Sequence, residues 1–500
     1  MGNHQLSTLL FLPFLGIIIQ LLIKKEKLAV IRNITAVVIG LQLWLTFQCL
    51  SLFDKSTPLL QFVDNYTWVN VFAINFFIGL DGINLPFIML TNLILFITLL
   101  LTWQSNSLPK TFYVLLLFFD IGLNGLLCAF DLFLFLSFLG ILLFSTFFLL
   151  TLFSTNTNRN SSFIFGVIAI CSFCLLLIGT LLITTQSSPL TFNLLSLVQG
   201  LKLPQNVQTI GFLIFLCGFL LMLPIFPFHF WFTHTILESN LPVNILFMTL
   251  FTKVGVYGIL RLVFPLFPTA TLKLGIILGT LAIISILYFA ICSFSYPVYK
   301  VKISYINGYY TSNILLSISA VILINHNQVT AVFSSLSGTM ALVAAYGLTI
   351  PLLILLPQIL PSNSVGKSTP KNNIALTKWT ISLIFLLIIM AGIGIPGFFG
   401  FAAYYINYLG LFQAIPTRIL AIIAFAGQLL ITIVFFQIIR DRILQQNQIQ
   451  YEAQDPAIGN HFIVIGILLF ILILIGIFPA SYLTISAASV KHLIEILGII

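Results

Sequence analysis

The sequence predicts an all-α polytopic membrane protein with about 14 transmembrane helices. Hydrophobic residues make up 60% of the 500 residues and charged residues only 6%, a composition far from that of soluble domains. Apolar runs of about 18 residues or more recur along the chain, long enough to cross the hydrocarbon core as helices. The period-two polarity of transmembrane barrel strands is not evident. Helices are therefore expected, because they satisfy their backbone hydrogen bonds internally.

Proline, asparagine and charged residues divide the chain into the expected helices. Their approximate ranges are 6–23, 28–49, 77–103, 111–129, 131–153, 161–184, 208–232, 241–264, 272–295, 303–324, 328–356, 376–408, 415–439 and 460–485. The first range is long for the apolar region of a signal peptide, so we expect it to remain as a helix.

Two of these expected helices, the seventh and the twelfth, are interrupted near their middles. Pro224 and Pro227 fall in the seventh, and Gly394, Pro396 and Gly397 fall in the twelfth. Proline lacks a backbone donor and clashes with the carbonyl one turn back, so both helices are expected to break at membrane depth. Paired broken helices five apart are typical of two repeated five-helix units.

We therefore expect one transmembrane domain over residues 1–500 with an internal repeat. Helices 1–3 at 6–103 precede a first five-helix unit at 111–264 and a second at 272–439, and a C-terminal helix follows at 460–485.

The net charge of +9 is interpreted as membrane topology rather than as nucleic-acid binding, because the basic residues are scattered in short loops. Connections from odd to even helices hold 13 of the 20 basic residues, and the opposite side holds six. The positive-inside rule then places both termini on the outer side. The 13 residues are Lys24, Lys25, Lys27, Arg32, Lys110, Arg159, Lys300, Lys302, Lys367, Lys371, Lys378, Arg440 and Arg442. The six cysteines all lie in apolar runs, which predicts neither disulfides nor a metal site.

The stretch from Gly211 to Val263 carries the clearest functional signal. After the two prolines it contains His229, His234 and Glu238, and Lys253 follows inside the next apolar run. An ionisable side chain within a transmembrane segment is by default a candidate functional residue. A broken helix beside a buried lysine is typical of ion-conducting membrane proteins.

Seven runs, in order along almost the whole chain, resemble the antiporter-like membrane subunits of respiratory complex I, most closely the chain 4 type of NADH:ubiquinone oxidoreductase. The runs are FFIGLDGINLPFIMLT (76–91), AFDLFLFLSF (129–138), LPIFPFHFW (223–231), LFTKVGVYGILR (250–261), KVKISYINGYYTSN (300–313), IPGFFGF (395–401) and LIGIFP (474–479). The resemblance implies a 14-helix subunit beside others of its kind, in which protons move along a central line of charged and polar side chains. It also implies that flavin, iron-sulfur clusters and quinone belong to other subunits.

The sequence departs from this family at the charges that matter most. The position nine residues after Asp131, where the family has a glutamate, is Gly140. The helix-seven lysine position is Met222, and the helix-twelve acidic position is Tyr404. Of the four central charges only Lys253 remains. A phenol has an ordinary pKa near 10, so it carries protons poorly at neutral pH.

The remaining proton-path candidates each have a structural alternative. Lys253 is either a remnant of the proton path or a donor to carbonyls freed at a helix break. His229 and Glu238 match family positions after the break, where packing, capping or a surface pair with His234 or Arg261 competes with proton entry. Asp120, in the middle of the fourth helix, is a candidate replacement for the lost glutamate.

Asp131 opens the fifth helix, so stabilisation of a helix N-terminus is the favoured role for it.

The leading interpretation is a core membrane-arm subunit of complex I, with no cofactor of its own, whose proton channel is impaired or silent. One alternative is a subunit that still pumps through Lys253, Asp120 and water held by hydroxyls. Another is a subunit of a multi-subunit cation/proton antiporter. The abundance of phenylalanine favours a mitochondrial inner membrane over a bacterial plasma membrane. The expected partners are neighbouring membrane-arm subunits and lipids.

Overall fold

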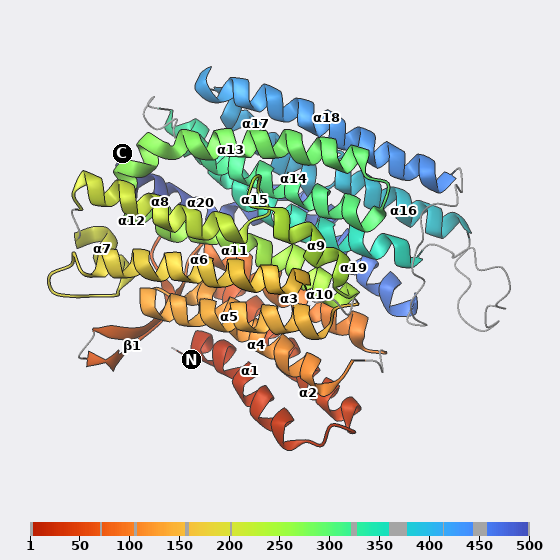
Figure 1. Cartoon of the computed structure of the whole chain (residues 1–500), viewed down its shortest axis with the longest axis horizontal. Helices are drawn as coiled ribbons and strands as arrows, with labels where there is room; N and C mark the ends of the chain where they lie inside the picture. The colour runs from red at the N-terminus through yellow and green to blue at the C-terminus, as the bar shows by residue number, and fades with distance from the viewer. Residues whose placement is uncertain are drawn as a thin grey trace.

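The computed structural model confirms a predominantly α-helical membrane fold with one β-hairpin. It describes residues 4–70, 73–104, 108–155, 160–200, 203–321, 328–359, 378–413, 415–443 and 458–498. Arg159, Lys202, Lys367 and Lys371, which entered the charge argument, lie outside these ranges. The long helices run roughly side by side in one bundle, and the start of α1 and the end of α20 lie toward the end that also carries the strand β1 (Figure 1).

The N-terminal part consists of five long helices and one hairpin. Helices α1 (Gln5–Leu22) and α2 (Leu28–Leu52) lie along one edge of the bundle (Figure 1). The hairpin strands are β1 (Gln61–Val69) and β2 (Ile74–Leu80), and the helices that follow are α3 (Asn84–Thr102), α4 (Lys110–Cys128) and α5 (Leu132–Leu152).

The middle of the chain contains the first broken helix. Its elements are α6 (Asn160–Thr184), α7 (Leu194–Gly200), α8 (Gln205–Met222), α9 (Phe230–Glu238), α10 (Leu241–Leu246), η2 (Phe247–Phe251), α11 (Thr252–Gly258), η3 (Ile259–Val263) and α12 (Phe264–Leu266). The elements from α10 to α12 form one continuous transmembrane segment, Leu241–Leu266.

The last part contains the second broken helix. Its elements are α13 (Pro268–Ser295), α14 (Tyr299–Ser319), α15 (Val329–Leu355), η5 (Leu356–Ile359), α16 (Lys378–Ile393), α17 (Phe399–Gln413), α18 (Ile415–Ile443), α19 (Ile458–Ile477) and α20 (Pro479–Ile496).

Twelve helical segments in the described ranges are long and apolar enough to cross a membrane. The predicted tenth helix corresponds to α14, which carries the polar run around Tyr309, and the predicted twelfth is divided into α16 and α17. The fold is therefore compatible with about 14 spans. Both predicted breaks are present, between α8 and α9 and between α16 and α17.

Two predicted boundaries are wrong. Residues 77–80, assigned to the third helix, belong to β2, and the helix starts only at Asn84. The expected C-terminal helix 460–485 consists of two helices, α19 and α20, because Pro479 cannot continue the first and instead occupies the start of the second. The division into two five-helix units stays a prediction, although α4 packs on α5 as α13 packs on α14, and α6 packs on the first broken helix (α8 and α9) as α15 packs on the second (α16 and α17).

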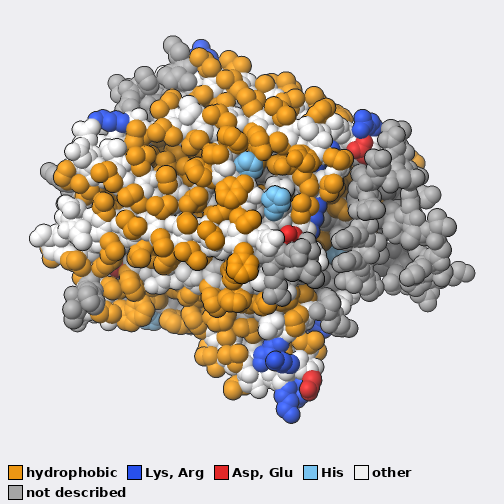
Figure 2. All heavy atoms as spheres, viewed as in Figure 1, with side chains coloured by type: hydrophobic (Ala, Val, Ile, Leu, Met, Phe, Trp, Pro, Cys, Tyr) orange, Lys and Arg blue, Asp and Glu red, His pale blue; other side chains and the backbone are white. Residues whose placement is uncertain are grey.

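The centre of the bundle is formed by Leu241–Leu266 and α15. In the most apolar 18-residue stretch of Leu241–Leu266 every residue is buried, and in that of the α15 segment 94% are buried. In α2, at the edge of the bundle, the corresponding share is 28%. Hydrophobic side chains cover the middle of the visible surface, with basic side chains toward its rim (Figure 2). A charged residue in a central helix is thus surrounded by protein rather than by lipid.

Candidate functional site

Lys253 lies in the most enclosed helix, between two π-helical turns. It belongs to α11, with η2 before it and η3 after it, and only 2% of its surface is exposed. In the described part of the chain its ammonium donates one hydrogen bond, to Thr252 Oγ1 at 3.4 Å, and no carboxylate forms an ion pair with it. An ammonium group has three donors. π-Helical turns are frequent at functional sites, so the backbone supports Lys253 as a candidate.

The first helix break is closed by neutral groups from α13. The N–H of Phe226, inside the break, donates to Ser285 Oγ at 3.0 Å. His229 follows, with its Nε2 3.0 Å from the hydroxyl of Tyr288 and with Nδ1 unpartnered among the described residues. The imidazole is 9% exposed and also packs on Phe289. His229 therefore contacts a phenol and aromatic rings at the break.

The second break uses the same chemistry. Gly394 and Gly397 have φ of +80° and +103°, a left-handed conformation that favours glycine. The two carbonyls just before the turn accept hydrogen bonds, Gly392 from the hydroxyl of Tyr310 at 2.6 Å and Ile393 from Nε2 of Gln428 at 2.9 Å. Gln428 in turn accepts from the hydroxyl of Tyr309 at 2.5 Å. The phenol of Tyr310 and the amide of Gln428 thus donate to the backbone carbonyls left free at this break.

Five tyrosines surround this break and form what we call the tyrosine cluster: Tyr309, Tyr310, Tyr346, Tyr404 and Tyr408. Tyr310 stacks on Tyr346 with ring centroids 4.0 Å apart, and Tyr346 meets Tyr404 edge-on at 5.8 Å. The hydroxyls of Tyr346, Tyr404 and Tyr408 have no hydrogen-bond partner in the described chain. Buried polar groups of this kind are the usual binding sites of internal water. Phenols therefore occupy the region in which the resemblance implies an acid.

The other two replaced positions are uncharged in different surroundings. Gly140 lies in α5, and a Cβ there would be 3.7 Å from the ring of Phe173 in α6, which is ordinary contact. Met222 is the buried last residue of α8, directly before the break.

Asp120 belongs to a polar network between α2, α3 and α4. Its Oδ1 accepts from Asn124 Nδ2 at 2.6 Å, and the same amide donates to Asn92 Oδ1 at 2.9 Å. Asn92 donates to Thr46 Oγ1 at 2.7 Å. All four side chains are at most 2% exposed. None of these hydrogen bonds reaches Lys253, so the structure places the two candidates in separate groups of helices.

The unpartnered atoms of this network are all acceptors. They are Asp120 Oδ2, Asn124 Oδ1 and, on the adjoining Gln42, Oε1. The amide orientations are fixed, because Asn124 donates to two oxygens and Gln42 donates to the carbonyl of Leu9 at 3.1 Å. These atoms can therefore accept from a donor, such as the second amide hydrogen of Gln42 for Asp120, a water molecule or a proton on Asp120.

Asp131 and Glu238 occupy helix ends. Asp131 is the N-cap of α5, where Oδ1 accepts from the N–H groups of Phe133 and Leu134 at 3.0 and 3.2 Å, while Oδ2 accepts from Asn75 N at 3.2 Å. This is the helix-terminus geometry expected for it. Glu238 ends α9, and its carboxylate accepts from the hydroxyl of Ser161.

A buried ion pair was not expected from the sequence. Arg261 in η3 donates to Asp81 Oδ2 at 2.6 Å, with the two side chains 10% and 6% exposed. The alternative in which Glu238 pairs with Arg261 is therefore not found, because Arg261 pairs with Asp81. Asp81 also caps α3 through its other oxygen, which accepts from the N–H groups of Ile83 and Asn84 at 3.0 and 2.9 Å. The motif GLDGINLPF indicated the capping role of Asp81, since an aspartate that directly precedes an apolar helical run is a typical N-cap.

The guanidinium has further partners of its own. It lies 4.5 Å from the centroid of the Phe130 ring, and its Nε is 3.3 Å from the hydroxyl of Tyr257. Tyr257 donates onward to the carbonyl of Leu127 at 2.7 Å. The pair thereby connects the start of α3 and the end of α4 to the helix that carries Lys253.

Two broken helices, a buried lysine and separate groups of buried polar side chains in a helical membrane bundle are the features of an antiporter-like membrane protein. The family model for the transmembrane region of NADH:quinone oxidoreductase and Mrp antiporter subunits matches residues 129–432, more than half of the chain. The chain belongs to this family.

Similar proteins cover nearly its whole length. NADH-ubiquinone oxidoreductase chain 4 of Arabidopsis thaliana is 24% identical over 503 residues, which cover 98% of this chain and 97% of that protein. F(420)H(2) dehydrogenase subunit M of Methanosarcina mazei is 26% identical, over 84% of this chain and 85% of its own. A chain in the structure of respiratory complex I from Thermus thermophilus shares the fold with a TM-score of 0.82 and 20% identity, covering 99% of this chain and all of that one.

Proposed function

We propose that this chain is a core membrane-arm subunit of a proton-translocating NADH:quinone oxidoreductase, of the chain 4 type, and that its own proton channel is silent. The first part is supported by family membership and by the end-to-end match with a protein named chain 4. The second part depends on this chain's own side chains. One observation carries it: Lys253, the buried lysine of the central helix, has no acidic partner in the described structure.

A proton relay needs groups that change their protonation during turnover. In a coupled carboxylate and lysine, each charge shifts the proton affinity of the other, and separating the two would release a proton. Gly140 and Met222 provide neither charge. Neutral side chains form hydrogen bonds with the backbone groups left free at both breaks, so the bent helices do not need charged side chains there. Lys253 then takes no part in satisfying either break, because the one hydrogen bond of its ammonium goes to Thr252 Oγ1.

The setting follows from the same proposal. The chain sits beside other membrane-arm subunits, including antiporter-like ones, in a mitochondrial inner membrane or a bacterial plasma membrane, with both termini on the outer side. Flavin, iron-sulfur clusters and quinone belong to other subunits.

The test is the number of protons moved per electron in the intact complex, reconstituted into closed vesicles, with Lys253→Met. Methionine keeps an unbranched chain of similar length and removes the charge. We expect an unchanged ratio. Lys302→Met is a matched control, because this buried lysine donates to Gln437 Oε1 at 3.1 Å outside the central segment. A lower ratio in Lys253→Met alone would contradict the silent channel and leave membership of the complex intact.

The runner-up is a subunit that pumps through Lys253, Asp120 and water. The unpartnered hydroxyls of Tyr346 and Tyr404 favour it, because they offer sites for water near the second break. A map of ordered water separates the two: a continuous wet path from either face to Lys253 supports pumping, and a dry axis opposes it. The third candidate, a subunit of a multi-subunit cation/proton antiporter, predicts that antiporter subunits and not redox subunits co-purify with the chain.

A further inference from the structure

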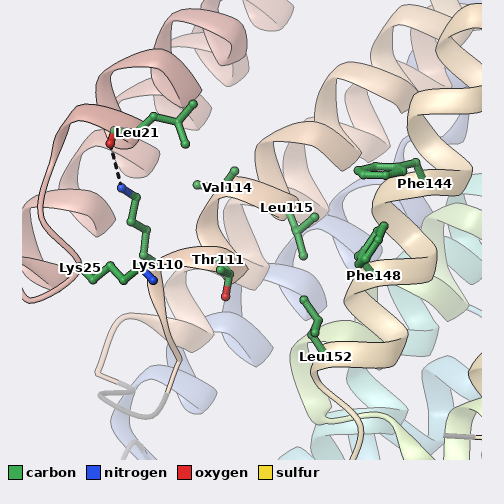
Figure 3. Close-up of a pocket in the computed structure, with 9 residues that line it drawn as sticks. All are labelled: Leu21, Lys25, Lys110, Thr111, Val114, Leu115, Phe144, Phe148 and Leu152. Atoms are coloured by element: carbon green, nitrogen blue, oxygen red, sulfur yellow. Dashed lines mark hydrogen bonds between the residues drawn. The ribbon is translucent and has the colours of Figure 1, made fainter.

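A groove on the side of the bundle is almost wholly apolar and has two lysines at one end. It lies between α1, α4 and α5 and has a volume of about 340 Å³ (Figure 3). Its walls are apolar side chains that include Val114, Phe144, Phe148 and Leu152, and Lys25 and Lys110 border one end mainly with their hydrocarbon stems. It lies outside the candidate site described above.

The cationic end lies where three helices meet the membrane boundary. Lys110 is the first residue of α4, and its ammonium donates to the carbonyls of Leu21 and Ile23 at 3.2 and 2.8 Å, at the end of α1. Two of its three donors are used in this way, and the third remains for another acceptor. Lys25 is exposed in the turn between α1 and α2. Basic side chains gather at the tip of the projection that these two helices form (Figure 2).

The apolar end extends along α5 toward the middle of the membrane. Phe144 and Leu152 are 53% and 47% exposed, and the rings of Phe144 and Phe148 are 4.6 Å apart. Eight residues separate Phe144 from Leu152, which corresponds to about 12 Å of helix. Figure 3 shows Phe144, Phe148 and Leu152 on one side of the groove, opposite Val114 and Leu115 of α4.

This combination selects an amphipathic occupant. Two ammonium groups at the membrane boundary favour an anionic group, and the apolar walls below them favour a hydrocarbon chain. Basic pockets between transmembrane helices bind the head groups of anionic lipids on the same physical grounds.

We propose that this groove binds an anionic phospholipid, with its phosphate at Lys25 and Lys110 and one acyl chain against α5. The site depends on the membrane location of the chain and not on its proposed function. Each lysine near an anionic head group contributes about 1 kcal/mol, which corresponds to about fivefold in affinity.

The test uses the intact complex in phosphatidylcholine nanodiscs with a trace of phosphatidylglycerol that carries a photoreactive group on its acyl chain. We expect crosslinks on α5 between Phe144 and Leu152. Unlabelled phosphatidylglycerol should compete for them, and phosphatidylcholine should not. Equal competition by both lipids would overturn the proposal, as would a crosslinked peptide showing that a protein helix fills the groove.

Matched variants locate the effect at the groove. Lys25→Gln leaves the bonds of Lys110 to α1 intact and should weaken competition about fivefold. Lys24→Gln removes the same charge from the same turn but not from the lining and should leave competition unchanged. Adding Lys110→Gln to Lys25→Gln should weaken it further, in a complex that still assembles. An equal weakening of competition in Lys25→Gln and Lys24→Gln would show that only the general surface charge attracts the lipid, and would refute the proposed site.

Discussion

Removing the charge of Asp81 should destabilise the protein more than most single substitutions outside the core. Asp81→Asn keeps the size of the side chain and an oxygen that can cap α3, but it leaves Arg261 without an anion. The guanidinium is 10% exposed and is held by Tyr257 and Phe130, so it cannot move into water without breaking those contacts. Removing one partner of a buried pair typically costs about 3–5 kcal/mol.

The assay is the free energy of unfolding of the purified chain in mixed detergent micelles, titrated with a denaturing detergent. Asp81→Asn is expected to lose about 3–5 kcal/mol. Arg440→Gln is the control, because Arg440 and Asp441 form a pair at 2.8 Å whose arginine is 61% exposed. An exposed pair of this kind contributes about 0–1 kcal/mol.

The double variant Asp81→Asn with Arg261→Met distinguishes the ion pair from its neighbourhood. If the loss comes from an unpaired buried guanidinium, removing that group should recover part of the stability of Asp81→Asn. A double variant as unstable as the sum of the two single variants would refute the argument. A loss below about 1 kcal/mol in Asp81→Asn would refute it as well, because that value is typical of exposed pairs.

Three further predictions use the same unfolding measurement. Gly122→Ala should cost about 1–3 kcal/mol, because its Cβ would lie 2.5 Å from the backbone nitrogen of Leu142. Gly140→Ala should be neutral or slightly stabilising, since the nearest atom to its Cβ is 3.7 Å away. Equal effects of the two substitutions would contradict the packing described. Tyr310→Phe should cost about 1–3 kcal/mol by leaving the Gly392 carbonyl unsatisfied, and Tyr405→Phe, on an exposed ring, should have no measurable effect. Asp120→Asn should be tolerated, because its amide can accept from Asn124 and donate to one of the unpartnered oxygens, and Asp120→Leu should lose about 1–3 kcal/mol; a severe loss in Asp120→Asn would indicate that the carboxylate charge itself is required.

The sequence was sufficient for the features that local chemistry determines. Proline and glycine inside long apolar runs act on the backbone at their own positions, so both helix breaks were predictable. Asp131 at the start of an apolar run likewise indicated the N-cap found in α5. The hairpin β1–β2 was missed because β1 contains polar residues such as Asp64 and Asn65, and β2 joins directly to the apolar run of α3.

Long-range pairing could not be derived in the same way. Asp81 and Arg261 are 180 positions apart, and nothing in either local run indicates that η3 reaches the start of α3. The Asp120 network combines side chains from α2, α3 and α4 and depends on the rotation of each helix. The sequence could identify an acid in the middle of a helix, but only the packing shows that its open positions are acceptors.

The hydrogen bonding at the two breaks shows how the scaffold of the proposed silent channel can be stable without charges at these positions. A broken helix exposes N–H and C=O groups inside the membrane, and each must find a partner in protein or water. Here Ser285 serves the first break, and Tyr310 and Gln428 serve the second. Because these partners are neutral, the bent helices do not depend on Gly140, Met222 or Tyr404 being charged. Under the proposed function, structural stability and proton conduction would rest on different residues, so substitutions that remove the second would leave the first intact.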